Sequence, residues 1–175
     1  MPKPASTVPL LSISNVTYTY GPLQALTGIS LEVRPGDLVV LAGRNGSGKS
    51  TLLRIAAGWT RSSAGSVRIA DLPVEHHERK IREFVVLVPD APSFWDELTA
   101  WEHLQFVAGV NRLRDWEGRA RSLLDQLGLR ARLDASPSGY SRGMRYKLGL
   151  AMALLLEPQL LLLDEPFGPL DGDAA

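Results

Sequence analysis

The sequence predicts an α/β fold whose core is a mainly parallel sheet, with an antiparallel β subdomain and a helical insertion. Three observations support this prediction. A glycine-rich loop at 43–51 lies between an apolar run and a helical pattern, a second apolar run at 160–163 ends in two carboxylates, and helical periodicity extends from about Thr99 to Leu127. Apolar runs that alternate with helices are typical of parallel sheets covered by helices.

The glycine-rich loop has the spacing of a phosphate-binding loop, G-x-x-x-x-G-K-[ST]. It is formed by Gly43, Arg44, Asn45, Gly46, Ser47, Gly48, Lys49, Ser50 and Thr51. The glycines allow the backbone to wrap around a polyanion, Lys49 can reach the β- and γ-phosphates, and Ser50 can ligate Mg²⁺. A chance turn rich in glycine and serine is the alternative. The order of strand, loop and helix around the motif argues against it.

The flanks of this loop supply that order. Residues Asp37–Ala42 form a short apolar run and are expected to be a buried strand. The residues after Ser50 suit a packed helix, which Gly58 is expected to end. Further along the chain, the pattern predicts a helix from about Gly143 to Leu156.

The predicted antiparallel part rests on alternating patterns. Apolar and polar residues alternate from Leu11 to Tyr20 and again from Ile29 to Val33, which ends at a Pro-Gly turn. Ser66–Ala70 and Phe84–Val88 are predicted as further short strands. The sequence therefore places an antiparallel sheet beside the phosphate loop.

Two carboxylates follow the last predicted strand, Leu160–Leu163. Open α/β sheets bind ligands at the carboxyl ends of their strands, which is where Asp164 and Glu165 are expected. Asp164 can hold Mg²⁺ directly or through water, and Glu165 can polarise an attacking water. This pattern is weak by itself and becomes strong downstream of a phosphate loop.

Composition restricts the alternatives. The 175 residues carry a formal net charge of zero, so no global field attracts nucleic acid or anionic lipid. Cysteine is absent, which excludes disulfides and thiolate metal sites. The longest apolar stretch, Leu148–Leu156, is too short to span a bilayer.

Between Leu11 and Asp171 the chain resembles the nucleotide-binding domain of ATP-binding cassette (ABC) transporters, which has a P-loop NTPase core. The motifs are the phosphate loop (Walker A), the strand ending in Asp164 and Glu165 (Walker B), and a variant of the LSGGQ signature at 141–145. Tyr20 matches the aromatic residue that stacks on adenine. Residues 168–171, Gly-Pro-Leu-Asp, resemble the loop that crosses the dimer interface.

The resemblance implies three parts within one cassette. Residues 1–92 would form the ATP-binding core with its antiparallel β subdomain, 93–140 a helical subdomain, and 141–175 the signature helix and the Walker B return to the core. It also implies a set of residues that bind nucleotide. These are Tyr20, Gly43, Asn45, Gly46, Ser47, Gly48, Lys49, Ser50, Thr51, Ser141 and Gly143.

The resemblance further implies a mechanism and partners. Two cassettes, identical or different, would pair head to tail, so that Ser141 and Gly143 meet the γ-phosphate of the partner's ATP. Lys49 and Glu165 would be catalytic, and Mg²⁺ would be held by Ser50, Asp164 and Asp90. The dimer would hydrolyse ATP and drive a separate transmembrane permease, without nucleic acid. It would be cytoplasmic and lie on the inner face of the membrane only through that permease.

The sequence departs from the family pattern at two places. Arg142 and Met144 replace a glycine and the glutamine of the signature, and Asp90 replaces a glutamine after the strand at 84–88. We expect Arg142 to add positive charge near phosphate. Asp90 is either a metal ligand or an ordinary turn residue, and Ser141 is either a phosphate contact or a helix N-cap.

The chain ends at Ala175, before the place of the family's switch histidine and of the strand expected between the phosphate-loop strand and the Asp164 strand. This predicts a cassette whose final strands are missing. Two alternatives to a transporter ATPase therefore stay open. One is a truncated, catalytically impaired nucleotide-binding fragment, and the other is an ABC ATPase of DNA repair or chromosome maintenance.

Overall fold

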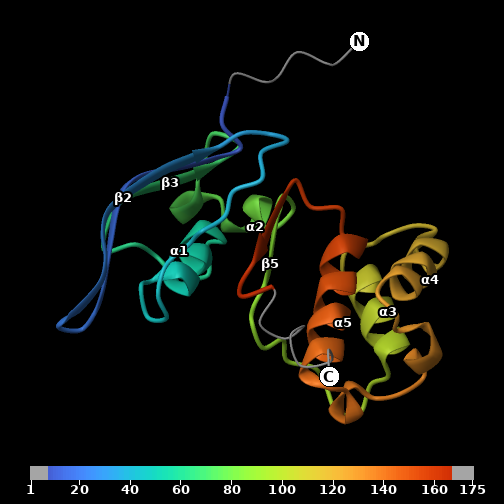
Figure 1. The fold of residues 1–175 in the computed structure, drawn as a ribbon. Helices are drawn as coiled ribbons and strands as arrows, with labels where there is room; N and C mark the ends of the chain where they lie inside the picture. The colour runs from blue at the N-terminus through green and yellow to red at the C-terminus, as the bar shows by residue number, and fades with distance from the viewer. Residues whose placement is uncertain (1–7, 167–175) are drawn as a thin grey trace. The chain divides into compact units, whose positions relative to one another are not determined.

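The protein has two hydrophobic cores. Its structure is a computed structural model that describes residues 8–166. One compact unit contains the chain up to Leu87 together with Gln159–Leu162, and the other contains Val88–Pro158 and the chain from Leu163. The elements of each unit can be followed in Figure 1.

The first unit contains an antiparallel sheet with the strand order β2-β1-β3-β4. Its strands are β1 (Leu11–Tyr20), β2 (Leu23–Val33), β3 (Ala64–Ile69) and β4 (Leu72–Pro73). The alternation in β1 buries Leu11 and Ile13 on one face, and an irregularity in the register between Ile13 and Val16 lets Val16 join the same core. The sequence prediction of an antiparallel sheet is confirmed, and the short turn between β1 and β2 sets their register, with Tyr18 opposite Leu26.

Helix α1 (Lys49–Ala56) covers this sheet with Leu52, Ile55 and Ala56, which share its core. The helix ends as predicted at Gly58, where φ is +73°. Gly58 N–H donates to Ile55 O at 3.0 Å and Trp59 N–H to Arg54 O at 2.8 Å. These two bonds form a Schellman motif. A 3₁₀ turn, η1 (Val74–His76), and the short helix α2 (Glu78–Ile81) follow the sheet.

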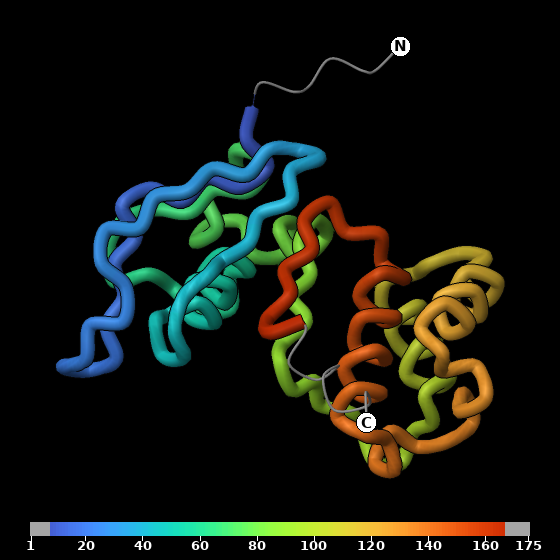
Figure 2. The backbone as a smooth tube through the Cα atoms, in the orientation of Figure 1, coloured from blue at the N-terminus to red at the C-terminus, as the bar shows by residue number. Residues whose placement is uncertain are grey.

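Strands β5 (Val85–Val88) and β6 (Leu160–Leu163) form a second, two-stranded sheet. Leu160 N–H donates to Phe84 O at 2.9 Å and Asp164 N–H to Val88 O at 3.0 Å. Because both partners advance together along the chain, the two strands are parallel. Figure 2 shows them side by side, and both predicted strands are confirmed.

The second unit is built on three helices, α3 (Ala100–Val110), α4 (Trp116–Gln126) and α5 (Arg142–Leu155). Two 3₁₀ turns, η2 (Arg130–Arg132) and η3 (Pro137–Gly139), join α4 to α5. Thr99 begins α3 with a capping box to Glu102, and this hydrogen bonding lowers the pKa of the Glu102 carboxyl. The predicted helical region is confirmed, and its apolar stripes form a core of their own.

One expectation about burial is wrong. Residues 37–42 form no strand, and Leu38 and Val40 are 93% and 78% exposed. Within residues 8–166 no strand pairs with this run, and a strand needs a neighbour for its backbone hydrogen bonds. The polar side chain of His103 is fully buried, and there its Nε2 accepts from Trp95 N–H at 3.0 Å and its Nδ1 contacts Thr99 O.

Gly65→Ala tests the packing of β3 on β1. Gly65 has φ +85°, and a Cβ there would lie 2.4 Å from the carbonyl oxygen of Asn15. Gly36 has φ +90° with nothing within 4 Å, so Gly36→Ala carries the backbone strain alone. In urea unfolding followed by circular dichroism, we expect a loss of about 1–2 kcal/mol for Gly36→Ala and about 1–3 kcal/mol more for Gly65→Ala. Equal losses would contradict the close approach.

Candidate nucleotide-binding site

The phosphate loop is shaped by its contact with β2. Gly48 has φ +91°, and a Cβ on it would lie 2.8 Å from the carbonyl oxygen of Ala25 and 2.7 Å from Cδ2 of Leu26. Only glycine combines this left-handed backbone with such a close approach. Gly43 is also confined, because a Cβ there would lie 2.7 Å from Oγ of Ser47. Side chains at Gly43 and Gly48 would therefore fill the concave space of the loop at 43–48, which we call the cradle.

Lys49 lies across this cradle. Its Nζ donates to the carbonyl oxygens of Gly43 and Arg44 at 3.0 and 3.2 Å. Ser47 N–H donates to Arg44 O at 3.1 Å and closes the turn of the loop. Helix α1 begins at Lys49 with no side-chain cap and no acidic residue in its first turn. The N-terminal end of α1 is positive, and no acidic side chain in the first turn of the helix offsets this charge. This end adjoins the exposed phosphate loop.

Tyr20 reaches the phosphate loop from the end of β1. Its hydroxyl lies 3.3 Å from Oγ1 of Thr51, and its ring meets the ring of Tyr18 edge-on at a centroid distance of 4.8 Å. The ring remains 46% exposed. The structure thus brings the predicted adenine-stacking residue to the loop and leaves part of its ring accessible.

The two carboxylates after β6 lie in different surroundings. Asp164 is 6% exposed, and its N–H is paired with Val88 O in the parallel ladder. Glu165 is exposed and has φ +50°, a conformation that costs a non-glycine residue free energy. Strained backbone of this kind concentrates at functional sites. Asp164 and Glu165 belong to the second unit, so their meeting with the phosphate loop stays a prediction.

The signature-like segment forms the start of α5. Ser141 is the N-cap, and its Oγ accepts from Met144 N–H at 3.2 Å, so the N-cap expectation for this residue is confirmed. Gly143 is buried in the first turn. Nη2 of Arg142 lies 2.5 Å from Oδ1 of Asp90, an ion pair that the sequence did not indicate. Residues 168–171 lie outside the described part of the chain.

Tyr146 is a buried residue that sequence reasoning missed. It lies one turn after Arg142 on α5, is 2% exposed, and its hydroxyl has no hydrogen-bond partner among residues 8–166. Burial, with Asp164 and Asp90 nearby, raises the pKa of Tyr146 to about 12. The i, i+4 spacing from Arg142 was the only signal that could have placed it on the same face as the ion pair.

These residues fit a magnesium-bound nucleoside triphosphate. A cradle limited to glycine, a lysine and a helix N-terminus suit phosphates, and Ser50 follows in the first turn of α1. No group of three or more metal-ligating side chains occurs among the described residues. Mg²⁺ held by phosphates, water and one or two side chains needs no such group.

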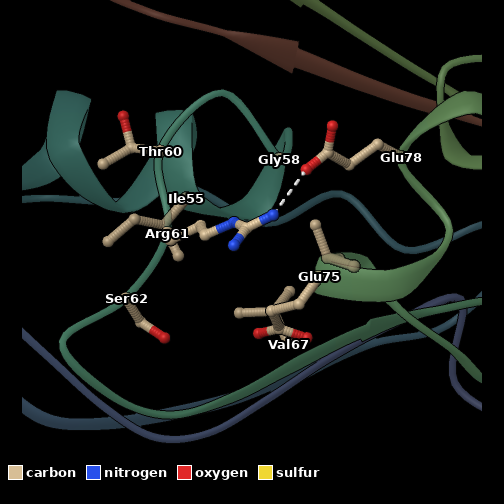
Figure 3. A pocket seen from close by; sticks show the side chains of 9 residues that line it. Ile55, Gly58, Thr60, Arg61, Ser62, Val67, Glu75 and Glu78 are labelled. Atoms are coloured by element: carbon tan, nitrogen blue, oxygen red, sulfur yellow. Dashed lines mark hydrogen bonds and ion pairs between the residues drawn. The ribbon is translucent and has the colours of Figure 1, made fainter.

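A surface hollow in the first unit, shown in Figure 3, lies near the opposite end of α1. It is lined by residues around Gly58, Val67 and Val74, and the exposed ion pair of Arg61 with Glu78 at 3.2 Å spans it. A Cβ on Gly58 would lie 2.9 Å from Cγ1 of Val74, so the hollow is narrow. None of the residues that line this hollow belongs to the phosphate loop.

The fold and the loop define a phosphate-binding α/β protein, and the comparisons specify its family. The sequence pattern of the ABC transporter family matches residues 26–168. The chain therefore belongs to the ABC transporter family. Among residues 8–166, no helix has the combined length and apolar character needed to cross a bilayer.

Several relatives are ATP-binding proteins of transporters. The uncharacterized ABC transporter ATP-binding protein YdbJ of Bacillus subtilis is 36% identical over 93% of this chain and 53% of its own length. The aliphatic sulfonates import protein SsuB of Pseudomonas putida is 36% identical over 94% and 58%. The Nod factor export protein I of Rhizobium etli is 36% identical over 94% and 52%. The chain spans about half the length of these relatives.

Two solved structures share the fold. An ATP-binding subunit of an ABC transporter matches with a TM-score of 0.84 and 31% identity over 91% of this chain and 68% of its own. CbiO1 of Clostridium perfringens, part of the transporter complex cbiONQ, matches with a TM-score of 0.75 and 26% identity over 91% and 66%. The predicted fold class is confirmed, and these names favour a transporter subunit over a DNA-maintenance ATPase or an impaired fragment.

Gly48→Ala is expected to weaken nucleotide binding by distorting the cradle against β2. Gly46→Ala is the matched control, because Gly46 has φ +80° but nothing within 4 Å of a Cβ. We expect the affinity for a fluorescent ATP analogue to fall about 10-fold more in Gly48→Ala, since overpacking costs about 1–3 kcal/mol. Equal losses would show that the contact with Ala25 and Leu26 is not what shapes the loop.

Tyr146→Phe is expected to remove a pH-dependent part of the stability. The pKa of Tyr146 is raised from 10.0 to about 12 in the folded state, so its stabilisation is complete below pH 10 and is lost as the pH rises towards 12. By pH 11 the wild type should lose about 1 kcal/mol more than Tyr146→Phe, measured by urea unfolding without metal from pH 8 to 11.

Tyr140 is an internal control for the comparison of the wild type with Tyr146→Phe. Burial also raises the pKa of Tyr140, whose hydroxyl donates to Arg132 O at 2.6 Å, and this contribution is common to both proteins. At pH 8 the two proteins should differ by less than about 1 kcal/mol, because the deleted hydroxyl has no hydrogen-bond partner in the described part of the chain. Identical pH profiles would refute the assignment of the raised pKa to Tyr146.

Proposed function

We propose that this chain binds and hydrolyses ATP as part of an ABC transporter subunit. In this proposal, MgATP binding and hydrolysis in a dimer drive substrate movement through a separate permease. The observation that carries it is the glycine-only cradle at Gly48 that leads directly into α1. Relatives named for import and for export share the cassette, so the substrate and the direction belong to the permease.

The phosphate loop supplies binding and most of the electrostatic stabilisation. In our proposal Gly43, Asn45, Gly46, Ser47 and Gly48 surround the phosphates with backbone N–H groups. Lys49 moves from the loop carbonyls to the β- and γ-phosphates, and Ser50 ligates Mg²⁺, which would neutralise developing charge. Thr51 orients the hydroxyl of Tyr20, whose exposed ring stacks on adenine; their 3.3 Å contact supports this role. Phosphoryl transfer depends mainly on such positioning.

The carboxylates after β6 divide the remaining roles. Asp164, buried and fixed by the parallel ladder, would hold Mg²⁺ or its water. Glu165, exposed and held in a strained backbone conformation, would orient and deprotonate the attacking water as general base. Their opposite exposures support this division, since a rigid anion suits a metal and an accessible one suits water.

A second cassette, identical or different, would complete the site. Ser141 and Gly143 would face the γ-phosphate of the partner's ATP across a head-to-tail dimer. The N-cap bond of Ser141 supports this role, because the hydroxyl accepts from Met144 and keeps its own proton for donation. The N-terminal end of α5, with no acidic residue in its first turn, adds a favourable dipole.

We also propose where the permease docks. Trp95 and Phe106 are 51% and 47% exposed, pack edge-on at 4.8 Å, and line a hollow with Glu97 and Leu98. Exposed aromatic hollows are typical interaction sites. The occupant would be an apolar cytoplasmic segment of the permease, which would hold this protein at the inner face of the membrane. The neighbour CbiO1, part of a transporter complex, supports an assembly of this kind.

Lys49→Ala and Glu165→Gln separate binding from turnover. Lys49→Ala should weaken ATP binding about 10-fold or more, since a charge-assisted hydrogen bond contributes about 1.5–3 kcal/mol. Glu165→Gln should retain binding, lower kcat by about 10²–10⁴-fold, and accumulate an ATP-dependent dimer. Binding, phosphate release and mass by light scattering would be measured for each purified protein.

Lys80→Ala, which removes an exposed lysine from α2, is the control for loss of a positive charge. It should leave binding and turnover within about 2-fold of the wild type. Turnover by Glu165→Gln at the wild-type rate would refute the general-base role. Absence of ATP binding by the wild type would refute the proposed function as a whole.

A further inference from the structure

Helix α5 meets the loop after β5 at two positions on one face. Arg142 and Gly149 lie two helical turns apart, so they project from the same side of the helix. Nη2 of Arg142 lies 2.5 Å from Oδ1 of Asp90. A Cβ on Gly149 would lie 2.9 Å from Cγ of Pro92, so the helix backbone itself contacts this loop. Residues 88–92 are therefore fixed on α5 at both ends.

The same loop is tied to the Walker B carboxylate. Val88, where the loop begins, accepts the N–H of Asp164 at 3.0 Å. Tyr146 lies between Arg142 and Gly149 along α5 and is 2% exposed. Burial raises the pKa of its hydroxyl, and the negative charges of Asp164 and Asp90 raise it further. A continuous set of contacts thus joins Asp164 to the first turn of α5.

The charge of Arg142 needs an explanation within the fold. Arg142 is the first residue of α5, and a cation at the positive N-terminal end of a helix is unfavourable. No acidic residue of the first turn compensates it. Asp90 supplies the missing negative charge from outside the helix. An aspartate near a helix N-terminus is itself favourable, so the pair satisfies both residues.

We propose that Arg142 and Asp90 act as one positioning pair for ATP hydrolysis. The pair fixes the loop at 88–92, and through Val88 the backbone of Asp164, to the helix turn that carries Ser141 and Gly143. This inference rests on the proposed function and replaces two expectations from the sequence. Arg142 is directed to Asp90 instead of phosphate, and Asp90 to Arg142 instead of Mg²⁺. The two departures from the family pattern are then one coupled change.

Because Arg142 and Asp90 are partly exposed, variants that break the ion pair are expected to keep the fold, so the positioning role can be tested by kinetics. The side chains of Arg142 and Asp90 are 62% and 38% exposed, and ion pairs of this kind contribute about 0–1 kcal/mol to stability. Removing either residue should therefore leave thermal unfolding almost unchanged. A kinetic effect that exceeds the effect on stability would indicate positioning.

The experiment compares Asp90→Asn, Arg142→Gln, the double variant, and the reversed pair Asp90→Arg/Arg142→Asp. Each single variant should lower kcat about 10-fold with KM for ATP changed less than about 2-fold. The double variant should be no worse than either single variant, and the reversed pair should recover most of kcat. Hydrogen exchange of residues 88–94 should rise in the single variants and fall again in the reversed pair.

Arg130→Gln is the matched control, because Arg130 forms an exposed ion pair with Asp125 at 3.2 Å in the same unit. It should not change kcat or exchange at 88–94. Additive losses, or a reversed pair no better than the single variants, would overturn the proposal. A raised KM for ATP in Arg142→Gln alone would also overturn it, because that result indicates that Arg142 contacts phosphate. A raised Mg²⁺ requirement in Asp90→Asn alone would overturn it as well, because that result indicates that Asp90 binds Mg²⁺. If the wild type lacks ATPase activity but the exchange pattern holds, the proposed function fails and the pairing stands.

Discussion

The structure of the first unit depends on how closely Gly48 approaches β2. The loop can pass Ala25 and Leu26 only without a side chain, so the curvature of the cradle is set by the sheet beneath it. Leu26 pairs in register with Tyr18, whose ring in turn packs on Tyr20. The antiparallel sheet therefore positions both the phosphate loop and the aromatic residue beside it. A short-range steric requirement in this way connects the shape of the phosphate loop to the packing of β1 on β2.

Helix α5 has the corresponding role in the second unit. Its buried residues join α3 and α4 in one core, which makes the helix rigid, and its N-terminal turn carries the signature-like segment. Arg119 of α4 pairs with Glu157 and donates to Leu155 O at the other end of the helix, where a cation is favourable. The loop at 88–92 is fixed on a helix that is itself held at both ends. Preorganisation of this kind is what electrostatic catalysis requires.

Local patterns were sufficient for most elements but not for contacts that depend on distant residues. Leu160–Leu163 was predicted with its observed bounds because four leucines between breakers have few alternatives. Residues 37–42 have an equally apolar pattern and form no strand, since pairing depends on a neighbour that local sequence does not specify. The Arg142–Asp90 pair joins residues 52 positions apart, and no local pattern connects them. Charges at helix ends were the physical signal that could have connected them.

The helices that follow the phosphate loop and the signature-like segment begin in the same way. Lys49 begins α1 and Arg142 begins α5, and neither helix has an acidic residue in its first turn. In both cases the cation at the unfavourable end contacts oxygen acceptors outside the helix, the loop carbonyls for Lys49 and Asp90 for Arg142. The difference lies in the acceptor. The carboxylate of Asp90 attracts a cation more strongly than a neutral carbonyl does, so it retains Arg142 at this position and suits it to positioning.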